Sequence, residues 1–383
     1  MNPIIIIGTG LAGFNLLKEL RKIDADRPIT LITSDDGMIY SKPMLSAGFG
    51  KEKTAEDLVM ATPEKLEEQY NITVLTHAKV EHIDEVNQQI ETADQTFTYD
   101  SLVLALGANT VKLPLSGDAL DRVYSVNDLL DYRRFREALN DGVKDVAIIG
   151  GGLIGCEFAN DLSNGGFNAT VIEPQGRVMP LLLPEAVSEV LESGLKALGT
   201  EFKYGHFAIA VNKTENGRCE VVMEDGSTVE ADLVVSAVGL RPRIAIAEST
   251  GLNVNRGILV DRHLQTSDAN IYALGDCVEL EQMILPYVMP IMASARALAK
   301  TLTGTPTAVS YGVMPVTVKT PACPLVVNPV LHTRAGEWEV EIDGLNSKAV
   351  FVAENGEKLG YALTGDCVKE KMALNKEMPA ILD

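Results

Sequence analysis

Two short glycine-rich segments constrain the fold of this chain more than any other feature. The first, Gly8-Thr9-Gly10-Leu11-Ala12-Gly13, follows the apolar residues 4–7, and the second, Gly150-Gly151-Gly152-Leu153-Ile154-Gly155, follows the apolar residues 146–149. In a strand–turn–helix of this kind, the first glycine makes the turn and the second lets a pyrophosphate approach the backbone. The third lets the helix pack on the strand. Two such motifs in 383 residues predict two bound dinucleotides, and the usual reason to hold two is to pass electrons between them.

The segments around the two motifs repeat one pattern. Each motif is flanked by a predicted strand and followed by a predicted helix and a second strand, at 3–8, 11–23 and 29–33 and again at 145–149, 153–163 and 169–173. An aspartate, an apolar run and a glycine occupy 100–107 and recur at 232–239, which indicates a duplicated architecture. From about residue 312 apolar and polar residues alternate, which predicts an antiparallel sheet with a helical tail.

We therefore predict an α/β fold with two Rossmann-like domains of the three-layer ββα type and a small C-terminal α+β domain. Segments 257–261 and 271–276 are expected to return the chain to the first domain. The expected limits are 1–110 with 243–311 for an FAD-binding domain, 111–242 for an NAD-binding domain and 312–383 for a C-terminal interface domain.

Composition excludes several classes of function. The net charge of −20 argues against a general nucleic-acid or anionic-membrane binder, and no apolar run approaches the roughly 20 residues of a membrane span. A first strand at residue 3 or 4 leaves no room for a signal peptide, so a cytoplasmic protein is expected. The five cysteines and five histidines have no spacing typical of a metal site or a disulfide framework, so no metal is expected.

Acidic residues assign a cofactor to each motif. Glu173 ends the second strand after the second motif, where a carboxylate accepts a hydrogen bond from an adenosine 2′-hydroxyl and repels a 2′-phosphate. This favours NADH over NADPH, although Arg177 nearby could weaken the preference. Asp35 is the candidate ribose ligand after the first motif, but it comes one or two residues later than usual.

A second feature places FAD at the first motif. Asp276 follows a strand and a glycine, where its carboxylate could bind a ribityl hydroxyl, which FAD has and NAD lacks. The segment 287–290, followed by 291–302, is predicted to form a helix with Pro290 near its first turn. The positive end of that helix suits the N1/O2 edge of an isoalloxazine ring, where negative charge appears on reduction.

These features, in this order over essentially the whole chain, resemble the two-dinucleotide flavoprotein reductases of the glutathione-reductase-like class. The chain lacks the C-x-x-x-x-C of the disulfide reductases in that class. Lys42 stands where the related NADH oxidases and peroxidases carry a redox cysteine, so the resemblance implies no thiol relay. The segments 40–46, 152–162 and 315–324 look like those of bacterial rubredoxin reductases.

The resemblance implies roles for individual residues. Lys42 near the flavin, with Glu157 as one candidate partner, would favour negative charge on the reduced ring, and Lys319 could add to this. The expected FAD-binding residues are Gly8, Thr9, Gly10, Leu11, Ala12, Gly13, Asp35, Lys42, Pro43, Val80, Glu157, Asp276, Val288 and Lys319. The expected NAD-binding residues are Gly150, Gly152, Leu153, Ile154, Gly155, Glu173 and Gly239.

The implied activity is electron transfer from NADH through FAD to rubredoxin, a small acidic iron protein, and indirectly to an alkane monooxygenase or to an oxygen-defence system. A ferredoxin or flavorubredoxin reductase, an NADH oxidase and a non-turnover NADH sensor remain open, with the oxidase disfavoured by Lys42. A local basic patch is expected to dock the partner, made by Lys18, Arg21 and Lys22 or by Lys42, Lys51 and Lys53. A monomer and a homodimer are both open.

Overall fold

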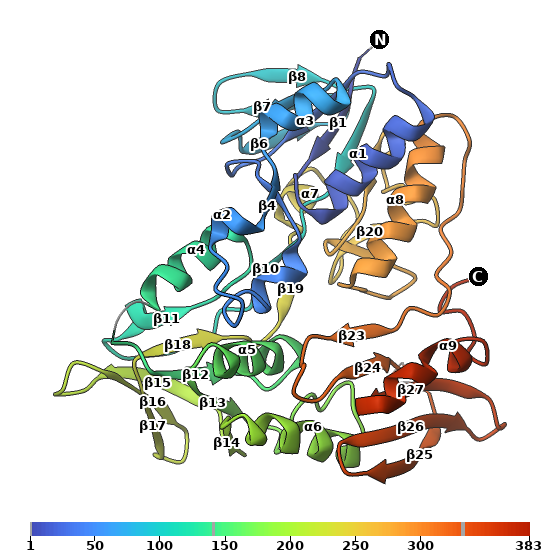
Figure 1. The fold of residues 1–383 in the computed structure, drawn as a ribbon. Coiled ribbons are helices and arrows are strands. Elements are labelled where there is room, and N and C mark those ends of the chain that lie inside the picture. The colour runs from blue at the N-terminus through green and yellow to red at the C-terminus, as the bar shows by residue number, and fades with distance from the viewer. Residues whose placement is uncertain (1, 140–141, 331–333) are drawn as a thin grey trace.

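A computed structural model describes residues 2–139, 142–330 and 334–383. Two five-stranded parallel sheets form the centres of two similar units (Figure 1). The first sheet has the order β21 (Ile271–Ala273), β9 (Ser101–Leu104), β1 (Ile4–Ile7), β2 (Ile29–Ile32) and β5 (Thr73–Leu75). The second has the order β11 (Val123–Tyr124), β18 (Leu233–Ser236), β12 (Asp145–Ile149), β13 (Asn168–Glu173) and β14 (Glu201–Tyr204).

Each parallel sheet lies between helices and a three-stranded antiparallel sheet. In the first unit, α1 (Leu11–Ile23) and α8 (Val288–Leu302) lie side by side (Figure 1). The antiparallel layer is β6 (Val80–Asp84), β7 (Gln89–Thr92) and β8 (Thr96–Thr98), and it adds Ile83 and Ile90 to the core. In the second unit, α5 (Leu153–Asn164) packs on β13, and the antiparallel layer is β15 (Ala208–Lys213), β16 (Cys219–Met223) and β17 (Thr228–Ala231).

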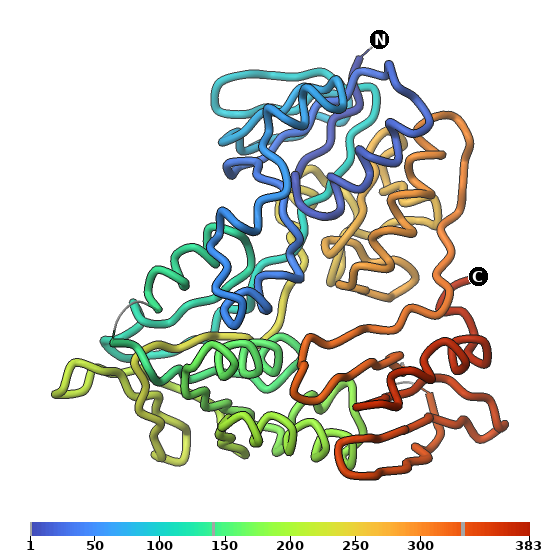
Figure 2. Tube along the Cα trace, viewed as in Figure 1, coloured from blue at the N-terminus to red at the C-terminus, as the bar shows by residue number. Residues whose placement is uncertain are grey.

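The chain leaves the first unit and returns to it at neighbouring points. β10 (Ala108–Thr110) leads out, β19 (Leu240–Pro242) leads back, and the two pair antiparallel. In the tube view these two connections run next to each other between the units (Figure 2). β21 then pairs with β9 and completes the first sheet. The domain limits stay a prediction, and the pairing of β10 with β19 close to residues 110 and 243 is the observation in their favour.

The C-terminal unit is a five-stranded sheet with the order β23 (Val316–Val318), β24 (Leu325–Asn328), β27 (Lys358–Thr364), β26 (Asn346–Ala353) and β25 (Gly336–Asp343). It ends in a 3-10 helix, η3 (Gly365–Glu370), and a short α9 (Lys371–Leu374). The sheet packs on α6 (Glu185–Ala197) of the second unit, where Leu191 and Leu195 share a core with Leu325 and Val327. The predicted fold class is therefore confirmed.

The remaining elements are short and mostly connect the layers. They are β3 (Ile39–Tyr40), η1 (Lys42–Ser46), α2 (Ala55–Leu58), β4 (Val59–Ala61), α3 (Pro63–Tyr70), η2 (Leu120–Arg122), α4 (Leu129–Ala138), α7 (Ala245–Ser249), β20 (Ile258–Val260) and β22 (Val278–Leu280). In the part of the chain that the structure describes, we find no helix with both the length and the apolar character needed to cross a bilayer.

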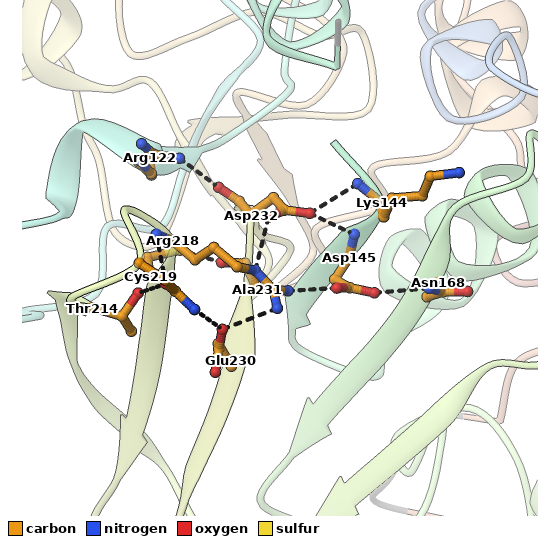
Figure 3. A network of polar contacts seen from close by, with 11 residues as sticks. Arg122, Lys144, Asp145, Asn168, Thr214, Arg218, Cys219, Glu230, Ala231 and Asp232 are labelled. Atoms are coloured by element: carbon orange, nitrogen blue, oxygen red, sulfur yellow. Dashed lines mark hydrogen bonds and ion pairs between the residues drawn. The ribbon is translucent and has the colours of Figure 1, made fainter. Parts of the chain in front are cut away.

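A network of charged groups fastens the antiparallel layer of the second unit to its parallel sheet (Figure 3). Arg218 directly precedes β16 in the chain. It donates hydrogen bonds to Glu230 and Asp232 at 2.9 Å each and also pairs with Asp145 at the start of β12. Asp232 in turn accepts hydrogen bonds from the backbone N–H groups of Lys144 (2.8 Å) and Asp145 (2.9 Å). One guanidinium thus joins β17, the residue between β17 and β18, and the start of β12, at the end of β12 opposite to the glycine turn.

Candidate functional site

One cavity of about 1850 Å³ extends across both units and reaches the C-terminal unit. Pockets for a single drug-sized ligand are about 300–1,000 Å³, so this volume suits two extended cofactors. Most of the residues expected at the site lie in its wall: Gly8, Thr9, Gly10, Leu11, Ala12, Asp35, Lys42, Pro43, Val80, Asp276, Val288, Gly150, Gly152, Leu153, Ile154, Glu173 and Gly239. Gly13, Gly155, Glu157 and Lys319 are not part of the wall that the described residues form.

The first glycine turn is shaped to admit a phosphate. Gly8 has a φ of +115°, and a Cβ added there would lie 2.3 Å from the carbonyl oxygen of Ala105. A Cβ on Gly13 would lie 2.0 Å from the oxygen of Gly8, so this glycine serves the packing of helix on strand. A Cβ on Gly10 would meet no atom of the described residues within 4 Å, which leaves the backbone open to a ligand. The first N–H groups of α1 face this opening, where a helix N-terminus favours an anion.

The second glycine turn repeats this geometry. Gly150 has a φ of +106°, and its added Cβ would lie 2.7 Å from the oxygen of Ala237. A Cβ on Gly155 would lie 1.9 Å from the oxygen of Gly150, whereas one on Gly152 would meet nothing within 4 Å in the described structure. Both turns therefore fit a pyrophosphate, as the sequence predicts.

Glu173, at the end of β13, lies in the wall of the cavity. Its Oε2 accepts a hydrogen bond from Gly151 N at 2.7 Å, and its Oε1 accepts one from Gln175 N at 2.9 Å. An ionised carboxylate has about four acceptor positions, so it can still accept a ribose hydroxyl. Arg177 is engaged elsewhere, because its Nη2 donates to the oxygen of Pro180 at 3.3 Å. The contact of Arg177 is thus with a neutral oxygen rather than with Glu173, and an acid at the position of Glu173 favours NADH.

Asp35 also lines the cavity although it comes late after β2. Its Oδ1 accepts hydrogen bonds from Thr33 Oγ1 (2.7 Å) and Gly37 N (3.0 Å). The turn after β2 is therefore closed by hydrogen bonds to this carboxylate, which lies in the cavity wall although it comes late in the sequence. Asp35 thus keeps its position as the candidate ribose ligand of FAD.

Lys42 begins η1, a 3-10 helix with Pro43 in its first turn. Its Nζ donates to Asn127 Oδ1 at 2.8 Å and lies 3.9 Å from Asp276 Oδ2. Burial lowers the pKa of Lys42, and the charge of Asp276 opposes this. Burial likewise raises the pKa of Asp276, with Lys42 opposing. Both residues lie in the cavity wall.

The structure corrects the suggested pairing of Lys42 with Glu157. Glu157 is fully buried on α5 and pairs with Lys319. Its carboxylate also accepts hydrogen bonds from Ser46 Oγ (2.6 Å) and from the backbone N of Lys319 (2.9 Å). The pairing was wrong because Lys42 and Ser46 lie at opposite ends of η1, where Ser46 contacts Glu157 and Lys42 contacts Asn127. Glu157 and Lys319 therefore lie behind the cavity wall, where they hold η1, α5 and the C-terminal unit together.

Sequence reasoning missed Asn127, which precedes α4 and lines the cavity beside Lys42. No motif marks it, and the only available signal was its position before Asp128, whose side chain caps α4. The predicted helix with a proline near its first turn is confirmed. α8 begins at Val288, so Pro290 lies within its first turn and Val288 and Met289 line the cavity.

The first suggested docking patch is largely engaged within the protein. Arg21 donates to the oxygens of Tyr70 (2.6 Å) and Asn71 (3.0 Å), and Lys22 pairs with Glu19 at 2.7 Å. By contrast, Lys371 and Met372 of α9 lie in the cavity wall, and Met372 is 65% exposed. The C-terminal unit thus contributes exposed residues to the cavity wall.

Comparisons with known proteins agree with this geometry. Residues 2–304 match the family described as pyridine nucleotide-disulphide oxidoreductase, and residues 308–378 match a rubredoxin binding C-terminal domain. The chain is 58% identical to the rubredoxin-NAD(+) reductase of Alcanivorax borkumensis, over 100% of both chains. It is 39% identical to the nitric oxide reductase FlRd-NAD(+) reductase of Aliivibrio fischeri, over 98% of each chain. A solved ferredoxin reductase from Rhodopseudomonas palustris superposes with a TM-score of 0.89 at 27% identity, covering 99% of this chain and 96% of the other.

Proposed function

The chain belongs to the pyridine nucleotide-disulphide oxidoreductase family, and from this premise we infer that it is an NADH-dependent rubredoxin reductase that uses FAD. The assignment of rubredoxin as the electron acceptor rests on the rubredoxin-binding domain at 308–378. This domain contributes Met314, Thr317, Lys371 and Met372 to the cavity wall. The domain that binds the acceptor therefore adjoins the site that holds the electron donor. Rubredoxin is the protein partner, and FAD and NADH are the cofactors.

The two cofactors divide the cavity between the two units. FAD, when bound, accepts a hydride from NADH and passes the electrons on singly to the acceptor. We propose that Gly8, Gly10 and the start of α1 hold the FAD pyrophosphate, and that Gly150, Gly152 and the start of α5 hold that of NADH. The open backbone at Gly10 and Gly152 supports this assignment.

Acidic groups select and orient the two cofactors in this proposal. Glu173 receives the adenosine ribose of NADH, and Asp35 receives that of FAD. Asp276 would receive a ribityl hydroxyl, and the N-terminus of α8, whose first residues line the cavity, would offer its positive dipole to the ring of FAD. The chain's own contribution to catalysis is thus binding, orientation and electrostatics.

We propose that the reductase supplies rubredoxin in an alkane hydroxylation or oxygen-defence chain, so that an alkane monooxygenase would be an indirect partner. A cytoplasmic location fits five unpaired cysteines, of which four are buried. The flavorubredoxin reductase alternative is favoured by one observation, the 39% identity to the relative from Aliivibrio fischeri.

Stopped-flow mixing tests the acceptor directly. The protein is reduced anaerobically with NADH and mixed in parallel with oxidised rubredoxin, the rubredoxin-like domain of a flavorubredoxin and a [2Fe–2S] ferredoxin. We expect the fastest reduction with rubredoxin. A faster reaction with either of the other acceptors would reassign the partner, and an equally slow reaction with all three, no faster than with oxygen, would favour an oxidase or a sensor.

A further inference from the structure

The closest partner of the Lys42 ammonium group is a neutral side chain, and its carboxylate partner lies farther away. Its Nζ is 2.8 Å from Asn127 Oδ1, within hydrogen-bond distance, but 3.9 Å from the nearer oxygen of Asp276. All three residues lie in the wall of the cavity. The closest contact of this partly exposed cation is therefore neutral, so that it fixes the position of the ammonium without itself cancelling the charge.

Asn127 is itself held so that its oxygen must face Lys42. Its Nδ2 donates to the carbonyl oxygen of Ala108 at 2.9 Å, which determines which end of the amide points to the ammonium. Its backbone N–H donates to Asp131 Oδ2 at 3.1 Å, and Asp128 accepts a hydrogen bond from Asp131 N at 2.8 Å to cap α4. Asn127 is 9% exposed. The amide is thus a rigid acceptor anchored to β10 and to the start of α4.

A neutral acceptor at this point has an electrostatic consequence. Charges in a cavity of low dielectric interact more strongly than in water, so a fixed cation there stabilises negative charge that develops on a nearby group. A carboxylate at the position of the amide would form an ion pair with Lys42 and remove most of this effect. The surrounding charges are Asp276, Asp128, Asp131 and Arg243, and burial lowers the pKa of Lys42 despite the three acids.

We propose that Asn127 is a positioning residue that holds the Lys42 ammonium toward the ring system of FAD and thereby sets how easily the ring is reduced. The inference rests on the proposed function only in placing FAD in this cavity. Asn127 acts through Lys42, so its effect on the flavin should vanish when Lys42 carries no charge. That dependence separates a positioning role from a structural one.

The test measures the midpoint potential of bound FAD by dye-coupled anaerobic titration in wild type, Asn127→Asp, Asn127→Ser, Lys42→Met and Asn127→Ser/Lys42→Met. Asn127→Ser keeps a neutral side chain, and it tests the proposal on its own if Asn127→Asp does not fold. Asn87→Asp is the matched control, because Asn87 lies in a turn that contacts Asp84 on β6, outside the cavity wall. FAD content and the visible absorption spectrum are recorded for every variant.

We expect Asn127→Asp, Asn127→Ser and Lys42→Met to shift the midpoint potential to more negative values, with Asn87→Asp unchanged. The midpoint potential of the double variant should equal that of Lys42→Met alone, because without Lys42 there is no ammonium group that the serine could displace. Unchanged potentials in the Asn127 variants with FAD fully bound would overturn the proposal, and so would a double variant whose shift is the sum of the two single shifts. Failure of the wild type to bind FAD or to be reduced by NADH would instead refute the proposed function.

Discussion

The buried carboxylate of Glu157 offers the sharpest test of how the three units are held together. Glu157→Ala removes the acceptor for Ser46 Oγ, Lys319 N and the Lys319 ammonium at once. Breaking a buried ion pair by removing one partner costs about 3–5 kcal/mol. The Lys319 side chain is 26% exposed and can partly regain water, which places the cost near the lower value, about 3 kcal/mol.

That cost is measurable as a change in thermal unfolding of the FAD-loaded protein. An unfolding entropy of about 2.1 cal/mol/K per residue gives about 0.8 kcal/mol/K for a chain of this length, so Tm should fall by about 4 °C. Glu157→Gln retains an acceptor oxygen and should lose about half as much. Lys319→Met completes a double-mutant cycle with Glu157→Ala. The Tm of the double variant should fall by less than the sum of the decreases in the two single variants. A Tm for Glu157→Ala within 1 °C of wild type, or strictly additive losses, would refute the reasoning.

Three further predictions follow from the geometry. Gly10→Val should abolish FAD binding yet leave the far-UV circular dichroism spectrum unchanged, because a Cβ at Gly10 meets no described atom within 4 Å; a yellow, fully loaded variant would contradict this. Glu173→Ala should raise the KM for NADH about tenfold and reduce the preference for NADH over NADPH, since a hydrogen bond to a charged group contributes about 1.5–3 kcal/mol. An unchanged ratio of the KM values for NADH and NADPH in steady-state assays would count against a role of Glu173 in binding the ribose. Arg218→Met should destabilise the second unit by about 1–3 kcal/mol, because Asp232 and Glu230 lose a shared partner; proteolysis kinetics that match wild type would show the network to be dispensable.

The parts of the fold that follow from local chemistry could be predicted from the sequence. The glycine turns impose positive φ at Gly8 and Gly150 and forbid a side chain at Gly13 and Gly155, so the motif alone implies strand, turn and helix. The late Asp35 was a weaker prediction, because its approach to the cavity depends on a turn closed by hydrogen bonds from Thr33 and Gly37.

Contacts between segments that are distant in the chain could not be predicted from the sequence. Glu157 and Lys319 are 162 residues apart, and Lys42 and Asn127 are 85 apart. No periodicity or spacing encodes which end of η1 faces α5, so the partner of Lys42 could not be chosen. Asn127 lacks any motif because its function comes only from its position beside Lys42.

One face of α5 holds both the loop that contains Lys42 and the C-terminal unit in place. Such a rigid arrangement suits an electron carrier that has no redox cysteine at position 42. Residues Glu157, Asn160 and Asp161 are spaced by three and four positions and therefore share one side of the helix. Glu157 holds Ser46 and Lys319, Asn160 accepts a hydrogen bond from Ala322 N at 3.1 Å, and Asp161 accepts them from the backbone N–H groups of residues 49 and 50 at 2.7 and 3.1 Å. The helix whose N-terminus is proposed to bind NADH is thus fastened both to the loop beside the flavin site and to the rubredoxin-binding domain. Hydride and electron transfer need positioned cofactors more than mobile thiols, so a rigid connection of this kind serves the proposed reaction.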